Sequence, residues 1–279
     1  MKIYFKQLFF VLVSVLVLAS CGNTPAKKGR VVTVTIEPLR YFASQIAGSR
    51  FDVVTMVPGD GNPETYEPSA QQMVNLSQSD LYIKVGSIGF ERTWMKKLEA
   101  NAPHAIVVDS SQGIEMLKTP AGTPDPHTWM SAANARIIAQ NIYRALASID
   151  TRDSAYFREN LETLLAHIDS VDCSVRQQIT KDKSQTFLIY HPILTYFARD
   201  YGLKQIPMEE EGREPSAAQL QATIDEANRE GVKTFFVQRQ FANRNVSVVA
   251  KATKTEQIEI NPLGFEWDKE MIKIAKLLK

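Results

Sequence analysis

One stretch of the sequence, from Thr151 to Lys181, constrains the fold more than any other. It contains no glycine or proline, and its apolar residues recur at steps of four and three. These residues are Phe157, Leu161, Leu164, Ile168, Val171, Val175 and Ile179. Such spacing predicts one long amphipathic helix, which we place at residues 151–182. We therefore expect this helix to join two halves of the chain, residues 31–150 and 183–279.

Strand and helix patterns alternate on both sides of the predicted long helix. Short runs rich in β-branched and aromatic residues predict strands at 31–36, 51–57, 80–85, 105–109, 187–190, 205–208, 234–237 and 257–260. Helical spacing falls between and after them, at 38–47, 69–76, 91–101, 132–149, 193–200, 215–230, 245–252 and 266–279. Alternation of this kind implies a parallel sheet covered by helices. We predict an α/β fold of two lobes, each built on such a sheet and joined by the long helix.

The N-terminus has the pattern of an export signal. An apolar run from Leu8 to Leu18 follows two lysines and is too short to span a bilayer comfortably. It ends in Leu-Ala-Ser-Cys-Gly, which resembles a bacterial lipobox with Cys21 as the lipidated residue. An ordinary cleavage site with an incidental cysteine is the alternative. We expect a lipoprotein signal peptide at 1–20 and a flexible tether at 21–30, so that the protein is exported and lipid-anchored to a bacterial membrane.

Composition narrows the possible stabilising features and partners. The chain has 279 residues and two cysteines, so Cys173 has no intramolecular partner once Cys21 carries lipid. Stability must then come from a packed core, for which about 250 mature residues suffice. The formal net charge is +1, with scattered lysines and arginines. This balance gives no electrostatic case for binding nucleic acid, and we expect a monomer.

Four polar residues are predicted near strand ends, where open α/β sheets bind ligands. His127 lies in the rigid segment Asp125–Trp129, between a proline and a tryptophan. His191 and Asn261 each follow a predicted strand directly, and Glu64 lies in the loop after another. Taken alone, His127 could equally cap a strand end and bond to the backbone. Together, the four residues indicate a metal site, with two of them from each half.

Several motifs in order resemble a known family over nearly all of the mature chain. They are Pro58-Gly59, Pro63-Glu64-Thr65-Tyr66-Glu67-Pro68, Asp125-Pro126-His127-Thr128-Trp129, His191, Tyr196-Phe197, Tyr201-Gly202-Leu203, Glu214-Pro215-Ser216, Gln219-Leu220, Phe235-Phe236-Val237 and Asn261-Pro262-Leu263-Gly264. The family is that of the metal-binding solute-binding proteins of ABC importers, of the zinc and manganese type. The resemblance implies a fold like that of cluster A-I periplasmic binding proteins. In such proteins two lobes on a stiff helix clamp one divalent cation.

The resemblance also implies metal ligands. His127 matches a family metal histidine, and His191 matches a position that is histidine in zinc-type members and commonly a carboxylate in manganese-type ones. Glu64 stands where the family usually has histidine, and Asn261 stands where it usually has aspartate. A site of three histidines and one aspartate carries one negative charge. The set of Glu64, His127, His191 and Asn261 carries the same charge, because Asn261 is neutral. We therefore predict that the carboxylate has moved to the N-terminal lobe and that Glu64 ligates the metal. A weakened site or a changed cargo is the competing interpretation.

Zinc is the cation that the two histidines favour, with manganese and iron(II) as alternatives. The stretch 115–124 lacks the histidine-rich loop that zinc-type members often carry, so auxiliary zinc capture there is not expected. The fourth ligand could be Asn261, a water molecule or an acid of the run Glu209–Glu211. A charge run of this kind is more often a solvated face. His167 lies within the long helix and is expected to be structural or solvent-facing.

These observations favour a binding protein that delivers a divalent metal ion to an ABC permease, and not an enzyme. A metal-dependent hydrolase is one alternative, because two histidines and a carboxylate also describe a catalytic zinc site. The chain has no His-Glu-x-x-His helix and no general base placed by spacing, which argues against it. An adhesin-like lipoprotein that retains the fold with a weakened metal site is the other alternative.

Overall fold

The computed structural model describes residues 30–179, 185–209, 214–241 and 244–278. The chain divides into two units, Met1–Arg30 and Val31–Lys279. Every described helix and strand lies in the second unit, apart from Arg30, which begins the first strand. The predicted signal peptide, Cys21 and the tether up to residue 29 lie outside the described residues.

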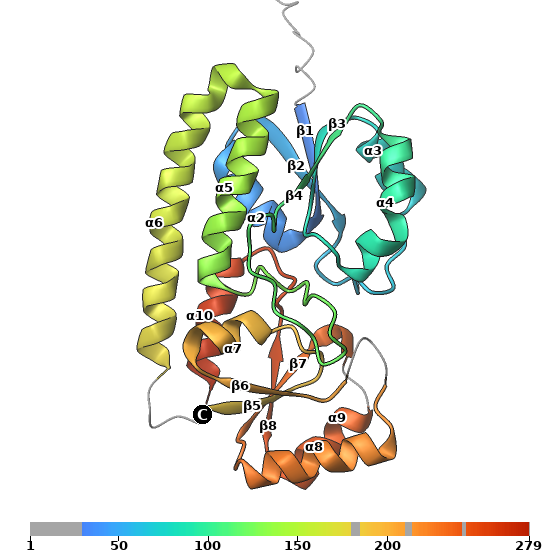
Figure 1. Cartoon of the computed structure of the whole chain (residues 1–279), viewed down its shortest axis with the longest axis vertical. Coiled ribbons are helices and arrows are strands. Elements are labelled where there is room, and N and C mark those ends of the chain that lie inside the picture. The colour runs from blue at the N-terminus through green and yellow to red at the C-terminus, as the bar shows by residue number, and fades with distance from the viewer. Residues whose placement is uncertain (1–29, 180–184, 210–213, 242–243, 279) are drawn as a thin grey trace, which may run out of the picture. The chain divides into compact units, whose positions relative to one another are not determined.

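The first half contains a four-stranded sheet in the order β2-β1-β3-β4 (Figure 1). The strands are β1 (Arg30–Ile36), β2 (Phe51–Val57), β3 (Ser79–Lys84) and β4 (Ile106–Asp109). The intervening helices are α2 (Glu37–Ala47), α3 (Ala70–Leu76) and α4 (Gly89–Asn101). β3 pairs in parallel with both β1 and β4, as the alternating pattern predicts. Ser69 caps α3 in a capping box with Gln72, which explains why this helix begins there.

The second half repeats the same architecture, with strand order β6-β5-β7-β8. The strands are β5 (Thr186–Ile189), β6 (Lys204–Pro207), β7 (Thr234–Gln238) and β8 (Glu256–Ile260), and all neighbouring pairs are parallel. The helices are α7 (Thr195–Tyr201), α8 (Ala217–Arg229), α9 (Arg244–Thr253) and α10 (Trp267–Leu277), with a short 3-10 turn η2 (Arg239–Phe241) after β7. The predicted α/β fold with two parallel sheets is confirmed.

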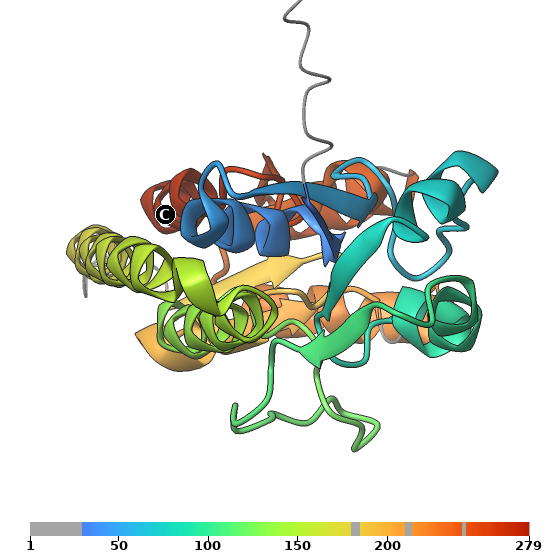
Figure 2. The same ribbon diagram turned by 90° about the horizontal axis from the view of Figure 1, so that it is seen from above.

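The predicted long helix is present as α6 (Ser154–Gln178), preceded by the 3-10 turn η1 (Thr151–Asp153). Its apolar stripe from Phe157 to Val175 is buried, and it packs against α2, α5 (Ala132–Ile149) and α10. Figure 2 shows α5 and α6 side by side along one flank of the sheets. The end predicted at residue 182 falls in 180–184, outside the described residues.

The hydrophobic core is continuous between the two halves. One cluster of buried side chains includes Val34 of β1, Phe157 and Ile168 of α6, Phe187 of β5 and Trp267 of α10. A smaller cluster, which includes Phe235 and Val249, lies within the second half alone. Because side chains from both sheets share the larger cluster, moving one half against the other would disturb close packing. The two halves are therefore coupled, with the long helix as part of the shared core.

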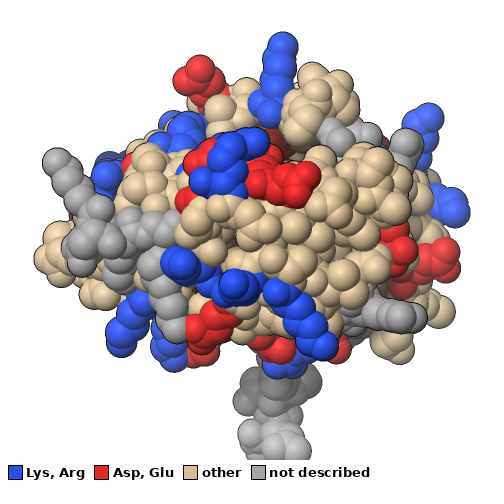
Figure 3. Space-filling model, turned by 90° about the horizontal axis from the view of Figure 1, so that it is seen from below, with Lys and Arg blue, Asp and Glu red and all other residues tan. Residues whose placement is uncertain are grey.

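The surface carries charges of both signs. Lysine and arginine side chains are interspersed with aspartate and glutamate on the face seen from below (Figure 3), in agreement with the net charge of +1. Within the part of the chain that the structure describes, none of the helices is both long and apolar enough to cross a membrane.

Candidate metal centre

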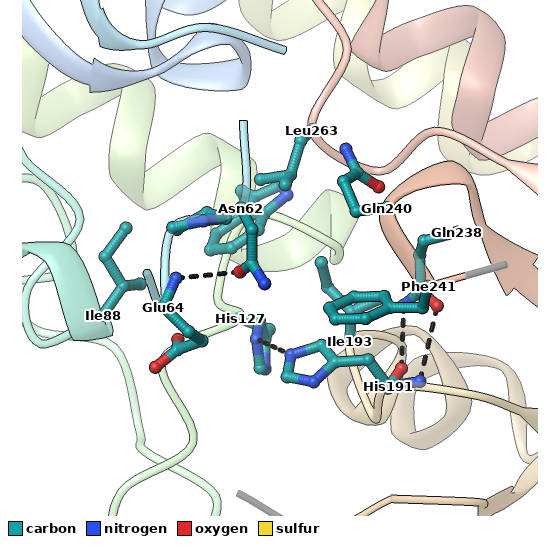
Figure 4. Close-up of a pocket in the computed structure, with 12 residues that line it drawn as sticks. Asn62, Glu64, Ile88, His127, His191, Ile193, Gln238, Gln240, Phe241 and Leu263 are labelled. Atoms are coloured by element: carbon teal, nitrogen blue, oxygen red, sulfur yellow. Dashed lines mark hydrogen bonds between the residues drawn. The ribbon is translucent and has the colours of Figure 1, made fainter. Parts of the chain in front are cut away.

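His127 and His191 face each other in a pocket between the two halves. His127 lies on the long loop between β4 and α5, and His191 lies two residues beyond the end of β5. Their Nε2 atoms are 3.1 Å apart, and the planes of the two rings stand at 85° (Figure 4). Both residues are 8% exposed. Each half of the molecule thus supplies one imidazole to the same point.

Each histidine is held through its other ring nitrogen by a buried carboxylate. Nδ1 of His127 lies 2.8 Å from Oδ1 of Asp125, and Nδ1 of His191 lies 2.6 Å from Oε1 of Glu209. A carboxylate accepts a hydrogen bond from an Nδ1–H group, which directs Nε2 toward a metal ion. In this structure the two Nε2 atoms share a hydrogen bond, and its proton must leave before both lone pairs can bind a metal ion. Glu209 is 5% exposed, so the interpretation of its acidic run as a solvated face is wrong for this residue.

The Asp125 carboxylate is favoured in its ionised form. Burial opposes the charge, but the hydrogen bonds from His127 and the interaction with its charge outweigh burial and lower the pKa of Asp125. The same oxygen also accepts a 2.9 Å hydrogen bond from the backbone N–H of His127. Asp125 therefore orients both the ring and the backbone of this histidine.

Residues from several elements fix the positions of the two rings. Tyr196 of α7 donates a 2.8 Å hydrogen bond to the carbonyl oxygen of Asp125. Gln238, at the end of β7, donates a 2.9 Å bond to the carbonyl oxygen of His191. The His191 ring stacks on Phe241 with 5.4 Å between ring centroids, and the rings of Trp129 and His127 form a T-shaped pair with 5.5 Å between centroids. The histidine pair is therefore held in place before any ligand arrives.

The spacing of the two Nε2 atoms suits a tetrahedral cation. Zinc binds imidazole nitrogen at about 2.0–2.1 Å, so two nitrogens on one tetrahedral ion stand about 3.3 Å apart. The observed distance of 3.1 Å is close to this value. A small change in ring position would place one cation between them.

Glu64 lines the same pocket but does not join the histidine pair. Its backbone N–H donates a 2.9 Å hydrogen bond to Oδ1 of Asn62, which holds the loop after β2 in a turn. Its carboxylate accepts long hydrogen bonds from the backbone N–H of Gly89, at 3.4 Å, and from Nη2 of Arg92, at 3.3 Å. Figure 4 shows the carboxylate pointing away from the two imidazoles.

Asn261 is exposed and is not among the residues that line the pocket. Its backbone N–H donates a hydrogen bond of 2.6 Å to Oε1 of Glu270. Within the described residues, no group of three or more His, Cys, Asp or Glu side chains is gathered closely enough to hold a metal ion. The structure thus brings two of the four predicted residues together, leaves Glu64 at the pocket wall and leaves Asn261 outside.

Sequence reasoning missed several residues of the pocket. They are Asn62, Ile88, Ile193, Gln238, Gln240 and Phe241, whereas Pro63, Trp129 and Leu263 also line the pocket and were named only as parts of the motifs. Gln238 could have been found, because it ends β7 at the same sheet edge as His191. Asp125 and Glu209 could be named as partners of the histidines only from the structure.

Two α/β halves with a histidine-lined pocket between them define a two-lobed binding protein. Residues 32–273 match the family described as zinc-uptake complex component A, periplasmic, or ZnuA. The chain therefore belongs to the ZnuA family. The resemblance predicted from the motifs is confirmed.

Individual relatives agree with this assignment. A crystal structure of ZnuA superposes with a TM-score of 0.85 at 33% identity, covering 89% of this chain and 97% of that one. The high-affinity zinc uptake system protein ZnuA of Bacillus subtilis is 26% identical, over 89% of this chain and 86% of its own length. The manganese ABC transporter substrate-binding lipoprotein PsaA of Streptococcus mitis is 27% identical, over 88% and 85%.

Proposed function

We propose that this protein binds one zinc ion between its halves and delivers it to the permease of an ABC importer. The observation that best supports this proposal is the 3.1 Å distance between the two Nε2 atoms, each on a ring held by a carboxylate. The description of the family names zinc uptake, whereas the relative PsaA is named for manganese. Two imidazole ligands suit zinc better than manganese, which prefers oxygen donors.

We further propose that Glu64 becomes the third ligand by turning toward the histidines. It already lines their pocket, and its present hydrogen bonds are long. The fourth position goes to Asn261 or to a water molecule. Asn261→Ala separates these two cases, because a ligating amide would cost zinc affinity and a water ligand would leave affinity unchanged.

Reversible binding fits the pocket better than hydrolysis does. A catalytic zinc ion is a resident cofactor held by three protein ligands at once. In the described part of the chain, no group of three His, Cys, Asp or Glu side chains is gathered closely enough to hold a metal ion, and the carboxylates beside His127 and His191 bind the far nitrogens of the rings. A site that must gather its third ligand when the ion arrives can also release that ion, as delivery to a permease requires.

We propose that the protein acts outside the cytoplasm, as a monomer anchored by lipid on Cys21. The support is the lipobox sequence, together with relatives named as lipoproteins. Cys21→Ser should release the exported protein from the membrane fraction. A Cys21→Ser protein that stays membrane-bound would contradict the lipid anchor.

Zinc binding is tested by elemental analysis of purified protein, followed by titration against a chromophoric chelator. We expect one zinc per chain, weaker binding of manganese, and a loss of zinc affinity of at least about 100-fold in His127→Ala and in His191→Ala. His167→Ala is the control, because His167 is exposed on α6 and bonds to Asp268. Failure of the native chain to bind zinc or manganese would overturn the proposed function.

A further inference from the structure

We propose that Arg92 sets the metal affinity of this site by competing with the metal ion for the Glu64 carboxylate. This inference rests on the proposed function, in which Glu64 is the third ligand. In the structure the carboxylate is bound at the N-terminus of α4, by Arg92 and by the N–H of Gly89. Metal binding must then exchange these contacts for a metal–carboxylate bond.

The N-terminus of α4 has the features of a docking position for this carboxylate. Nη1 of Arg92 donates a 2.7 Å hydrogen bond to the carbonyl oxygen of Ser87, which keeps the guanidinium beside Glu64. A Cβ atom on Gly89 would lie 2.2 Å from Oε2 of Glu64, so the carboxylate occupies space that only glycine leaves open. The helix N-terminus adds a partial positive charge.

The docked carboxylate and the histidines share a cleft. Glu64, Arg92, His127 and His191 all line one cleft. The side chain of Glu64 is 26% exposed and that of Arg92 is 61% exposed, so neither is locked in the core. Rotation of the Glu64 side chain within this cleft exchanges one partner for the other.

The size of the effect follows from the exposure of the ion pair. Partly exposed pairs contribute little, which limits the competition to roughly two- to fivefold in affinity. Arg92 also repels the cation through space, and this effect must be separated from competition for Glu64. Lys96 provides the control, because it is an exposed cation on α4 one turn after Arg92.

The test measures zinc Kd by chelator competition for the native chain, Arg92→Gln, Lys96→Gln, Glu64→Gln and the double variant Glu64→Gln/Arg92→Gln. We expect Arg92→Gln to bind zinc roughly two- to fivefold more tightly, and more tightly than Lys96→Gln. This gain in zinc affinity should disappear in the Glu64→Gln background, because that variant has no Glu64 carboxylate for Arg92 to release. Raising the salt concentration should shrink the gain.

Gly89→Ala gives a second route without changing any charge. The added methyl group would displace the Glu64 carboxylate from its docking position. It would also lie 3.0 Å from the Cα atom of Glu64, so the backbone there must shift slightly. Alanine itself is favourable in a helix. We expect this variant also to bind zinc more tightly, with an unchanged circular dichroism spectrum.

Specific outcomes would overturn the role of Arg92. Affinity in Arg92→Gln that equals that of Lys96→Gln, or that falls, would show that Arg92 does not withhold Glu64. If Arg92→Gln raised zinc affinity equally with and without the Glu64 carboxylate, Arg92 would act only by repelling the cation through space. Both results presuppose a native chain that binds zinc and a Glu64→Gln variant that binds it more weakly. Absence of binding by the native chain would instead be the failure of the proposed function.

Discussion

His127 and His191 are 64 positions apart in the chain, yet their Nε2 atoms lie 3.1 Å from each other. Each comes from a different half, so the approach depends on how the two halves are packed. The core cluster shared by both halves and by α6 holds that packing. The pair is therefore preorganised, and little of the binding free energy is needed to assemble it.

Removal of the carboxylates behind the histidines should weaken metal binding without unfolding the protein. We expect Asp125→Asn and Glu209→Gln each to lower zinc affinity about 10- to 100-fold, because the amides hold the rings less well and reduce their basicity. Chelator competition measures the loss. Asp225→Asn, on the exposed face of α8, is the matched control and should bind zinc like the native chain. Native affinity in both site variants would remove the two carboxylates from the metal centre.

Loss of the Glu64 side chain should weaken zinc binding by less than loss of either histidine. Glu64→Ala removes the proposed third ligand but leaves the histidine pair and its carboxylates intact. The measurement compares zinc Kd for Glu64→Ala and for Glu67→Ala, an exposed glutamate of the same loop. Unchanged affinity in Glu64→Ala would exclude Glu64 from the site and leave water to complete the coordination.

Truncation of the buried stripe of α6 should destabilise both halves together. Ile168 is fully buried in the cluster that includes side chains of both sheets. We expect Ile168→Ala to lower the free energy of unfolding by about 2–5 kcal/mol. A single denaturation transition should persist, because the core is continuous. Glu162→Ala, on the exposed face of the same helix, should change the free energy of unfolding by less than about 0.5 kcal/mol. Two separated transitions in urea would show that the halves unfold independently.

Glu91 should make the stability of the protein depend on pH. It is 2% exposed and accepts hydrogen bonds from the backbone N–H groups of Val85 and Gly86. Burial raises the pKa of Glu91, although these hydrogen bonds and one from Thr35 oppose the shift. Because the pKa is raised, Glu91 contributes fully to the free energy of unfolding at pH values below its pKa in the unfolded chain, about 4.5. This contribution is lost as pH rises through the pKa of Glu91 in the folded protein.

The measurement for Glu91 is the free energy of unfolding of the native chain and of Glu91→Gln across pH 4 to 8. As pH rises, the free energy of unfolding of the native chain should fall relative to that of Glu91→Gln, by about 1.4 kcal/mol for each unit by which folding raises the pKa. Parallel curves over this range would mean that the pKa of Glu91 is not raised.

Most of the fold could be predicted because its signals are local. The stripe of α6 and the alternation of strands and helices follow from backbone geometry, which repeats every 3.6 or 2 residues. The predicted helix 132–149 coincides with α5, and the other described elements agree within a few residues. The 3-10 turn at Thr151–Asp153 was not predicted, because one short turn leaves no periodic pattern.

The site was only partly predictable. The position of His191 after a predicted strand and the rigid segment around His127 pointed to these two residues, and the structure places both in one pocket. The same reasoning gave no sign that Arg92, 28 positions away, would bind the carboxylate of Glu64, or that Asn261 would lie outside the pocket. It also left Glu209 as a candidate solvated acid, although this residue is buried against His191.

Local patterns in the sequence are enough to predict the two α/β halves, the long helix, and His127 and His191 as candidate ligands, since each depends on residues that are neighbours in the chain. Which side chains meet depends instead on tertiary packing. The partners of His127 and His191, and the contact between Glu64 and Arg92, depend on side-chain directions at the ends of elements that are distant in the chain. Packing of the shared core sets those directions, and no local pattern encodes it.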